Sequence, residues 1–250
     1  MMYRQIITLL ILLLGISALP LTAHAHDEAP WRGPRFSVET RTHAGKSFRI
    51  FHGGAMDFTT TRPQHTNTRV LLMVAGTYTS PQNTAEGHII DHGTAQHRTC
   101  DLSCRNWNAV AIIESGYVRI MRQDAEALER SRLLTEVIRS RGSLIQGHLL
   151  VEHGVPIRGY ARGRPYHRRA LATMDDRLRI GDIIESAQPH TSLSDFAKHL
   201  AALGYRNAIN LDMGAWDEGW YRDPNTGTIH PIGQIRTATN RQTNWIIIRK

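Results

Sequence analysis

The stretch that decides the fold is residues 191–221, TSLSDFAKHLAALGYRNAINLDMGAWDEGWY. Ser192 and Asp195 have the spacing of a capping box, in which each side chain can satisfy a backbone N–H at the start of a helix. Apolar residues then recur at helical spacing up to Gly204, whose lack of a Cβ suits the left-handed residue that ends a helix. A short apolar run of buried-strand length, residues 208–211, follows. The stretch therefore predicts a helix, a buried strand and a polar turn.

The polar turn begins at Asp212, where the predicted strand ends. Asp217 and Glu218 follow closely, and Gly214 and Gly219 lie in the same turn. A carboxylate that leaves a buried strand into such a turn can face a cleft and take part in chemistry. The alternative is a turn whose aspartate hydrogen-bonds its own backbone, which is a common role for this residue.

The first 25 residues have the composition of a secretory signal peptide. They contain a short basic region with Arg4, an apolar core at residues 6–14 and a small-x-small cleavage site at residues 23–25. No later segment approaches the roughly 20 apolar residues that a spanning helix needs. We therefore expect a mature protein without a membrane span that is periplasmic or secreted.

Roughly 225 residues remain after cleavage, which suits a single domain. We expect a leader and first strands over residues 26–68 and the main domain over residues 69–250. Loss of Arg4 takes the formal net charge from +8 to +7. This excess favours acidic or phosphorylated polymers as partners, or it simply keeps the protein soluble. No aromatic-rich basic stripe indicates specific nucleic-acid binding, and the oligomeric state stays open.

The two cysteines, Cys100 and Cys104, lie close together in a polar segment. In an exported protein such a pair is expected to form a disulfide. A C-x3-C pair without a second pair is a poor zinc signature, and a redox role is a weaker alternative.

The remaining segments predict mostly strands. A helix is expected over residues 124–141, and strands or hairpins are expected over residues 36–51, 69–75, 86–93, 107–113, 116–121, 143–157, from residue 170, and 244–250. We therefore predict an α+β (mixed α/β) fold, a single domain with a large mixed sheet and few helices.

Four motifs follow one another in an order that is found in one known family. They are AGTY at residues 75–78 with GHIIDHG at 87–93, QGHLLVEHG at 146–154, RRALA at 168–172, and the opening helix and strand up to Gly214. In this order they resemble the phosphodiester glycosidase domain family, over residues 70–248.

The resemblance implies hydrolysis at an anomeric carbon that carries a phosphodiester. Such a reaction develops positive charge on the sugar, which a carboxylate stabilises, while the departing phosphate needs cationic donors. The resemblance implies Asp212 as the carboxylate, Arg168 as the phosphate clamp, and Asp217 or Glu218 as a second acid or base. The alternatives are an ion pair of Arg168 at the sheet edge and solvent-facing turn positions for the other two carboxylates.

Six further residues are candidates for substrate binding. Backbone N–H groups and a hydroxyl could contact phosphate, and aromatic rings could stack on a sugar. These residues are Gly76, Thr77, Tyr78, Gly87, Gly214 and Trp216. Trp216 and the nearby Trp220 could equally cap the core.

One departure from the family supports a second hypothesis. Residues 212–217, DMGAWD, stand where the family has a glycine-rich turn, so the backbone cannot approach a phosphate as closely. The protein could then be a catalytically altered periplasmic module that keeps the fold and holds acidic glycan on its Arg-rich loop, residues 158–169. The retained Arg168 and Asp212 favour the enzyme.

Fourteen histidines raise the question of a metal. His88 and His92 share a face of a predicted strand but would lie about 13 Å apart at ~3.3 Å per residue. We therefore predict no metal site, and the resemblance implies no cofactor.

Overall fold

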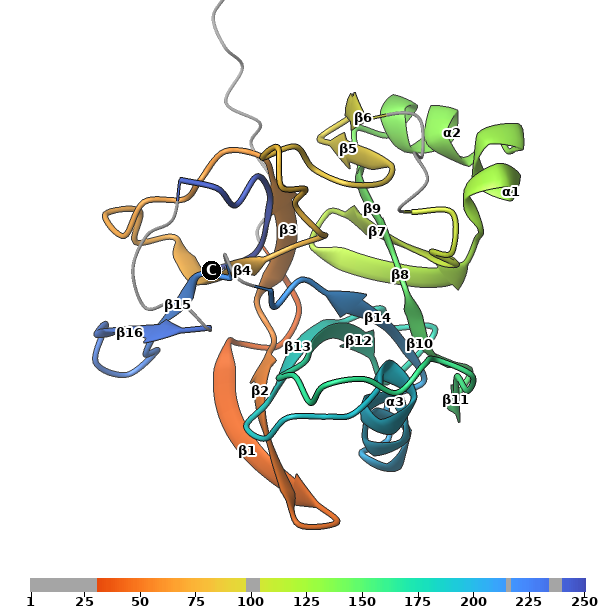
Figure 1. Ribbon diagram of the computed structural model, residues 1–250. Coiled ribbons are helices and arrows are strands. Elements are labelled where there is room, and N and C mark those ends of the chain that lie inside the picture. Colours follow the sequence, from red (N-terminus) through yellow and green to blue (C-terminus); the bar gives the residue numbers. More distant parts are fainter. Residues whose placement is uncertain (1–30, 98–103, 215–216, 234–239) are drawn as a thin grey trace, which may run out of the picture.

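The structure is a computed structural model that describes residues 31–97, 104–214, 217–233 and 240–250. Within these ranges the chain forms three antiparallel sheets and three short helices (Figure 1). The prediction of a strand-rich α+β domain with few helices is confirmed. The strands are divided among three antiparallel sheets rather than one large mixed sheet, and short turns pair many consecutive strands as hairpins.

The largest sheet has seven strands and carries the longest helix. α3 (Leu193–Ala202) covers one face, where Phe196 and Leu200 are fully buried against this sheet. In spatial order its strands are β1 (Ser37–His43), β2 (Lys46–His52), β13 (Gly181–Ser186), β12 (Arg169–Thr173), β14 (Asn207–Leu211), β10 (Leu149–Glu152) and β11 (Val155–Pro156).

The second sheet has five strands and contains both predicted hydrophobic strands at residues 69–75 and 244–250. Its order is β16 (Ile229–Ile232), β15 (Gly219–Arg222), β4 (Val70–Ala75), β17 (Trp245–Arg249) and β3 (Ala55–Thr59). β4 is buried along its whole length, as its continuous apolar run predicts.

The third sheet also has five strands, and two short helices cover it. Its order is β6 (Thr94–His97), β5 (Ile89–Asp91), β9 (Ser143–Gly147), β7 (Ala109–Glu114) and β8 (Tyr117–Arg122). The helices are α1 (Ala125–Arg130) and α2 (Leu133–Arg139). The single helix predicted for this region is wrong, because the N–H and hydroxyl of Ser131 both bond to the carbonyl of Leu128 and end the first helix there.

One apolar core joins the three sheets. Phe58 of β3, Ile145 of β9 and Leu171 of β12 belong to the same buried cluster. The predicted strand over residues 143–157 contributes to two sheets, because β9 and β10 are separated by His148 alone.

The start of α3 forms only half of the predicted capping box. The Ser192 side chain accepts a hydrogen bond from the backbone N–H of Asp195 at 3.0 Å. The carboxylate of Asp195 instead contacts Lys46 and His190. Gly204 has a φ of +96°, as the helix end requires.

Two of the sequence predictions concern segments outside the described residues. The predicted signal peptide lies wholly within residues 1–30, and Cys100 lies within residues 98–103. Cys104 is buried, and its pairing with Cys100 stays a prediction. Among the described residues, no helix combines the length and the hydropathy needed to cross a bilayer.

Candidate active site

Three strand ends from two sheets meet at one place. The backbone N–H of Asp212, just after β14, donates to the carbonyl of Gly76, just after β4, at 2.8 Å. β12 pairs with β14 so that Arg169 lies opposite Leu211. Arg168 and Asp212 are the next residues on the two strands. The structure therefore brings the strand ends at Gly76, Arg168 and Asp212 together.

Asp212 is a buried carboxyl whose environment favours the protonated form. Its side chain accepts the N–H of Gly214 at 2.9 Å, and the residue is only 7% exposed. Burial raises the pKa of Asp212 to about 6, and the charge of Asp217 acts in the same direction, whereas the Gly214 bond and the charge of Arg169 oppose it. A carboxyl with such a pKa is poised for acid–base or electrostatic work near neutral pH.

Arg168 supplies a half-buried cation at the strand end that adjoins Asp212. Its guanidinium lies 5.4 Å from the ring centre of Tyr166, and its Nε atom is buried with no hydrogen-bond partner among the described residues. Burial lowers the pKa of Arg168, while the phenols of Tyr78 and Tyr166 oppose this effect. Within the described residues Arg168 makes no ion pair, whereas its neighbour Arg169 makes buried ion pairs with Glu185 and Asp217.

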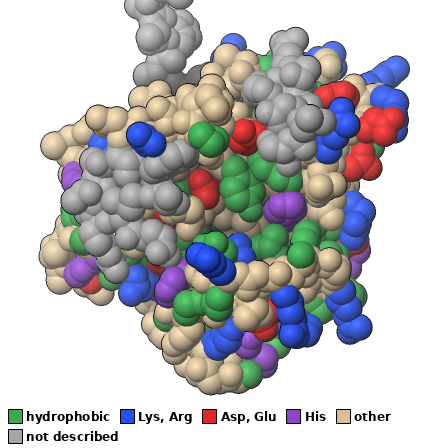
Figure 2. All heavy atoms as spheres, viewed as in Figure 1, with side chains coloured by type: hydrophobic (Ala, Val, Ile, Leu, Met, Phe, Trp, Pro, Cys, Tyr) green, Lys and Arg blue, Asp and Glu red, His purple; other side chains and the backbone are tan. Residues whose placement is uncertain are grey.

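A group of aromatic rings lies next to these charged residues. The ring of Tyr78 lies 4.9 Å from that of Trp107 and 6.1 Å from that of His148, and the latter lies 5.4 Å from Tyr160. Asn210 of β14 donates to the Tyr78 hydroxyl at 2.6 Å. On the face of the molecule that Figure 2 shows, hydrophobic side chains and a histidine lie together near the middle, with basic side chains below them.

Sequence reasoning missed most of this aromatic group. Only Tyr78 was a candidate, because the other rings are separated from it by long stretches of sequence. His148 lies in the single-residue gap between β9 and β10. Burial and the charge of Arg168 lower the pKa of His148 to about 4, so it is neutral at pH 7.

Asp217 is a buried structural partner. Its carboxylate receives two bonds from the guanidinium of Arg169, at 2.5 and 3.2 Å, and both side chains are fully buried. Arg169 also contacts Glu185 at 3.1 Å and the carbonyl of Asp212 at 3.3 Å. The alternative of a solvent-facing Asp217 is therefore wrong, because the residue is buried and its ion pair with Arg169 positions the strand end that carries Asp212. Its role as a second acid or base stays a prediction.

Glu218 is likewise committed to a partner. Arg62 donates to its carboxylate from Nε at 2.6 Å and from a terminal nitrogen at 3.2 Å, and the Glu218 side chain is 4% exposed. The sequence could not predict this ion pair, because Arg62 and Glu218 are 156 residues apart. Trp220 is buried, and Trp216 lies outside the described residues.

The predicted phosphate donors after β4 are used within the protein. The N–H groups of Gly76 and Thr77 donate to the carbonyl and side-chain oxygens of Asn244, and the Thr77 hydroxyl donates to the Gln146 carbonyl at 2.9 Å. These two residues therefore fix the strand end and have no free donor for a substrate. This is a correction of the sequence prediction.

The two predicted glycines have different environments. Gly87 has a φ of +81°, and a Cβ at this position would lie 2.6 Å from the ring of Trp107. The lack of a Cβ in glycine therefore leaves room for the aromatic group. Gly214 is exposed and holds Asp212 through its N–H. Two surface pockets, one beside Tyr117 and one beside Arg62, lie elsewhere.

Comparison with known proteins identifies the class of the domain. The three-sheet domain has a glycosidase-like fold, as the structural relatives below show. Residues 67–243 match the phosphodiester glycosidase family. Because this range is more than half of the chain, the chain belongs to the phosphodiester glycosidase family, and the resemblance seen in its motifs is confirmed.

Two solved structures have a similar fold. The first is the catalytic domain of zebrafish N-acetylglucosamine-1-phosphodiester alpha-N-acetylglucosaminidase, auto-inhibited by its pro-peptide, with 15% identity, a TM-score of 0.56 and coverage of 90% of this chain and 85% of that one. The second is a hypothetical protein from Synechocystis, with 14% identity, a TM-score of 0.50 and coverage of 86% and 62%. At these identities the likeness concerns the fold alone. No curated protein matches the chain.

Proposed function

We propose that the protein hydrolyses a sugar-1-phosphodiester of envelope or extracellular glycans. The observation that carries this proposal is the pairing of Asp212 and Arg168 at adjoining strand ends. One is a buried carboxyl with a pKa near neutrality, and the other is a cation whose Nε has no partner within the described residues. Both belong to the range that matches the family.

Each of the two groups has a distinct role in the reaction. Water adds to the anomeric carbon, the bond from that carbon to the phosphate oxygen breaks, and a phosphomonoester leaves. With a pKa of about 6, Asp212 is about nine-tenths ionised at pH 7, so it can stabilise the positive charge that develops on the sugar. The guanidinium of Arg168 can bind the phosphate oxygens through two parallel hydrogen bonds.

The aromatic group supplies a surface for the sugar ring. Tyr78 and Trp107 lie in contact with each other and beside Asn210, which comes two residues before Asp212. The apolar face of a sugar packs well on such rings, and polar side chains at their edge can contact its hydroxyls. This arrangement favours a glycan substrate over a small phosphate ester.

A second function, binding of acidic glycan without turnover, is supported by a different observation. The loop between β11 and β12 exposes Arg158, Arg162 and Arg164 and contains no acidic residue. An anionic polymer would be attracted to it whether or not hydrolysis follows.

Isotope labelling distinguishes the two functions. Purified protein is incubated with several sugar-1-phosphodiesters in ¹⁸O-water, and products are followed by ³¹P NMR and mass spectrometry. Cleavage at the anomeric carbon places ¹⁸O in the sugar and leaves the phosphomonoester unlabelled. Turnover should fall at least about 100-fold in Asp212→Asn, or ~2.7 kcal/mol at 1.36 kcal/mol per tenfold, whereas binding changes far less.

The control for this substitution is Asp223→Asn. Asp223 lies in the turn between β15 and β16, and backbone N–H groups there lower its pKa, so the change removes a carboxylate remote from the site. If wild type and Asp212→Asn both show only the background rate on these diesters while both still bind acidic glycan, the enzyme proposal fails and the binding function takes its place. Label in the phosphate would show a different reaction.

We also propose that the protein is exported and carries a bridge between Cys100 and Cys104. Support comes from the sequence of residues 1–25 and from the buried position of Cys104. Intact mass of protein isolated from the native host should place the mature N-terminus near residue 26. Alkylation with and without reductant should differ by two cysteines, and equal alkylation would exclude the bridge.

A further inference from the structure

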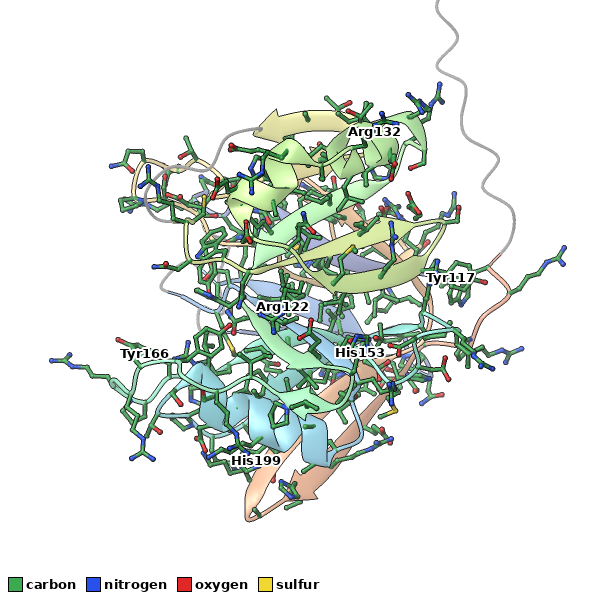
Figure 3. All side chains as sticks on the ribbon, turned by 90° about the vertical axis from the view of Figure 1, so that its right-hand side faces the viewer. Tyr117, Arg122, Arg132, His153, Tyr166 and His199 are labelled. Atoms are coloured by element: carbon green, nitrogen blue, oxygen red, sulfur yellow. The ribbon has the colours of Figure 1, made fainter. Side chains whose placement is uncertain are left out.

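A cluster of two imidazoles and one carboxylate lies around the start of α3, away from the strand ends described above. His190, Asp195 and His199 each present a ligand atom, and these atoms all lie within 4.8 Å of one another. Nδ1 of His190 is 3.1 Å from one carboxylate oxygen of Asp195, and Nε2 of His199 is 4.0 Å from the other. Figure 3 shows His199 on α3 next to the β1–β2 hairpin.

The fold builds this cluster from a single segment. Asp195 and His199 are one helical turn apart, so their side chains lie on the same face of α3. His190 is fixed just before the helix by two backbone hydrogen bonds with Tyr166, at 2.7 and 3.1 Å. The His190 side chain is fully buried, and that of His199 is 10% exposed. The three ligand groups therefore stand in place without a change of fold.

A second histidine pair orients one ring of the cluster. Nδ1 of His43, at the end of β1, is 2.9 Å from Nδ1 of His199. In the tautomer in which His199 donates from Nδ1, its Nε2 carries the lone pair and faces Asp195. Histidine ligands of metals are commonly held by such a bond from the other ring nitrogen.

A cation already stands at this place in the fold. The ammonium of Lys46 lies 3.2 Å from His190 Nδ1, from an oxygen of Asp195 and from the carbonyl of Pro189. The Lys46 side chain is 26% exposed, and it follows Gly45 in the open turn of the hairpin. The ammonium can therefore move into solvent when another cation takes its place.

We propose that His190, Asp195 and His199 form a binding site for a divalent transition metal, with Zn²⁺ the best match, and that Lys46 competes with the metal. Two imidazoles and one carboxylate are a ligand set of zinc sites with one open position, and imidazole favours such ions over Mg²⁺ and Ca²⁺. This proposal does not depend on the glycosidase activity.

The test is a titration of Zn²⁺ into tag-free, EDTA-treated protein by isothermal calorimetry. Wild type should bind one ion per chain with a dissociation constant in the micromolar range or below. Lys46→Met should bind at least about tenfold more tightly, because it removes the competing cation. Lys198→Met is the matched control, since it removes a positive charge from the exposed face of the same helix, and its affinity should stay close to that of wild type.

Loss variants test the ligands themselves. Asp195→Asn and His199→Ala should abolish the binding, whereas His153→Ala, which removes an exposed imidazole on another turn, should not. His43→Phe should weaken binding by about 10- to 100-fold, the usual effect of removing an orienting partner. Asp195→Asn keeps the cap of α3, because that bond uses the backbone N–H. Asp195→Asn therefore still tests the metal site if His199→Ala fails to fold.

The visible absorption of bound Co²⁺ gives an independent readout of the ligand geometry. A tetrahedral spectrum that disappears in Asp195→Asn supports the site. Absence of saturable Zn²⁺ binding by Lys46→Met would overturn the proposal. So would equal affinities of wild type, Asp195→Asn and His199→Ala, or an equal gain in Lys46→Met and Lys198→Met.

Discussion

Asp212→Asn should stabilise the folded protein near neutral pH although it removes the carboxylate that we propose for catalysis. The residue is 7% exposed, and burial raises its pKa from 3.8 to about 6. At ~1.4 kcal/mol per pKa unit, ionisation of this carboxyl opposes folding by about 3 kcal/mol. Asparagine is neutral at every pH. The free energy of unfolding should therefore rise by up to about 3 kcal/mol above pH 7.

The sign of the pH dependence follows from the direction of the shift. A carboxyl with a higher pKa in the folded than in the unfolded state contributes its full stability at low pH, and this contribution is lost as the pH rises through the folded pKa. The increase in the free energy of unfolding caused by Asp212→Asn should thus be about half of its value above pH 7 when the pH is about 5, and small at about pH 4. Urea denaturation followed by circular dichroism between pH 4 and 8 measures it.

Asp57→Asn provides a control with the opposite sign. Burial opposes ionisation of Asp57, but the hydrogen bond and charge of His92 and the charge of Arg249 outweigh it and lower the pKa. This substitution should therefore destabilise the protein at pH 8 and have less effect as the pH falls through that lowered pKa. If Asp212→Asn is no more stable than wild type at pH 8, or if its gain does not change with pH, the reasoning is refuted.

Three further predictions concern the surroundings of the site. Asp217→Asn removes an anionic partner of the buried Arg169 and should cost about 3–5 kcal/mol, visible as a lower Tm in calorimetry; an unchanged Tm would contradict this. Gly87→Ala places a methyl group 2.6 Å from the Trp107 ring, so both Tm and substrate affinity should fall, and a wild-type KM would remove Trp107 from the site. Arg168→Lys should lower substrate affinity and kcat together, because lysine keeps the positive charge but cannot make two parallel hydrogen bonds to a phosphate. A change in KM alone would indicate that Arg168 has only a binding role.

Local signals in the sequence predicted much of the frame. The cap at Ser192, the end at Gly204 and the apolar run before Asp212 each depend on neighbours within a few residues, and each was correct. The position of Asp212 at a strand end followed directly from them. The family resemblance added Arg168 as a candidate, through the RRALA motif at residues 168–172.

The partners of the charged residues could not be predicted in this way. Arg168 and Arg169 are adjacent and identical in type, and only the register with β14 decides which one enters the core. Thr77 had the right chemistry for a phosphate donor, but its acceptor, Asn244, is 167 residues away. Such pairings are a property of the assembled sheets and leave no local pattern.

The passage of the chain from β9 to β10 has a consequence for how a ligand reaches the site. Only His148 separates the two strands, and both flanking residues are paired, Gly147 with Ala109 and Leu149 with Ile209. Arg122 of β8 also bonds to Glu152 of β10 at 2.7 Å (Figure 3). Opening the largest sheet and the third sheet as separate lobes would expose the apolar core that they share, so we expect the two sheets to move as one body. Substrates must therefore enter by rearrangement of loops and side chains over a fixed frame, and association should not be slowed by domain closure.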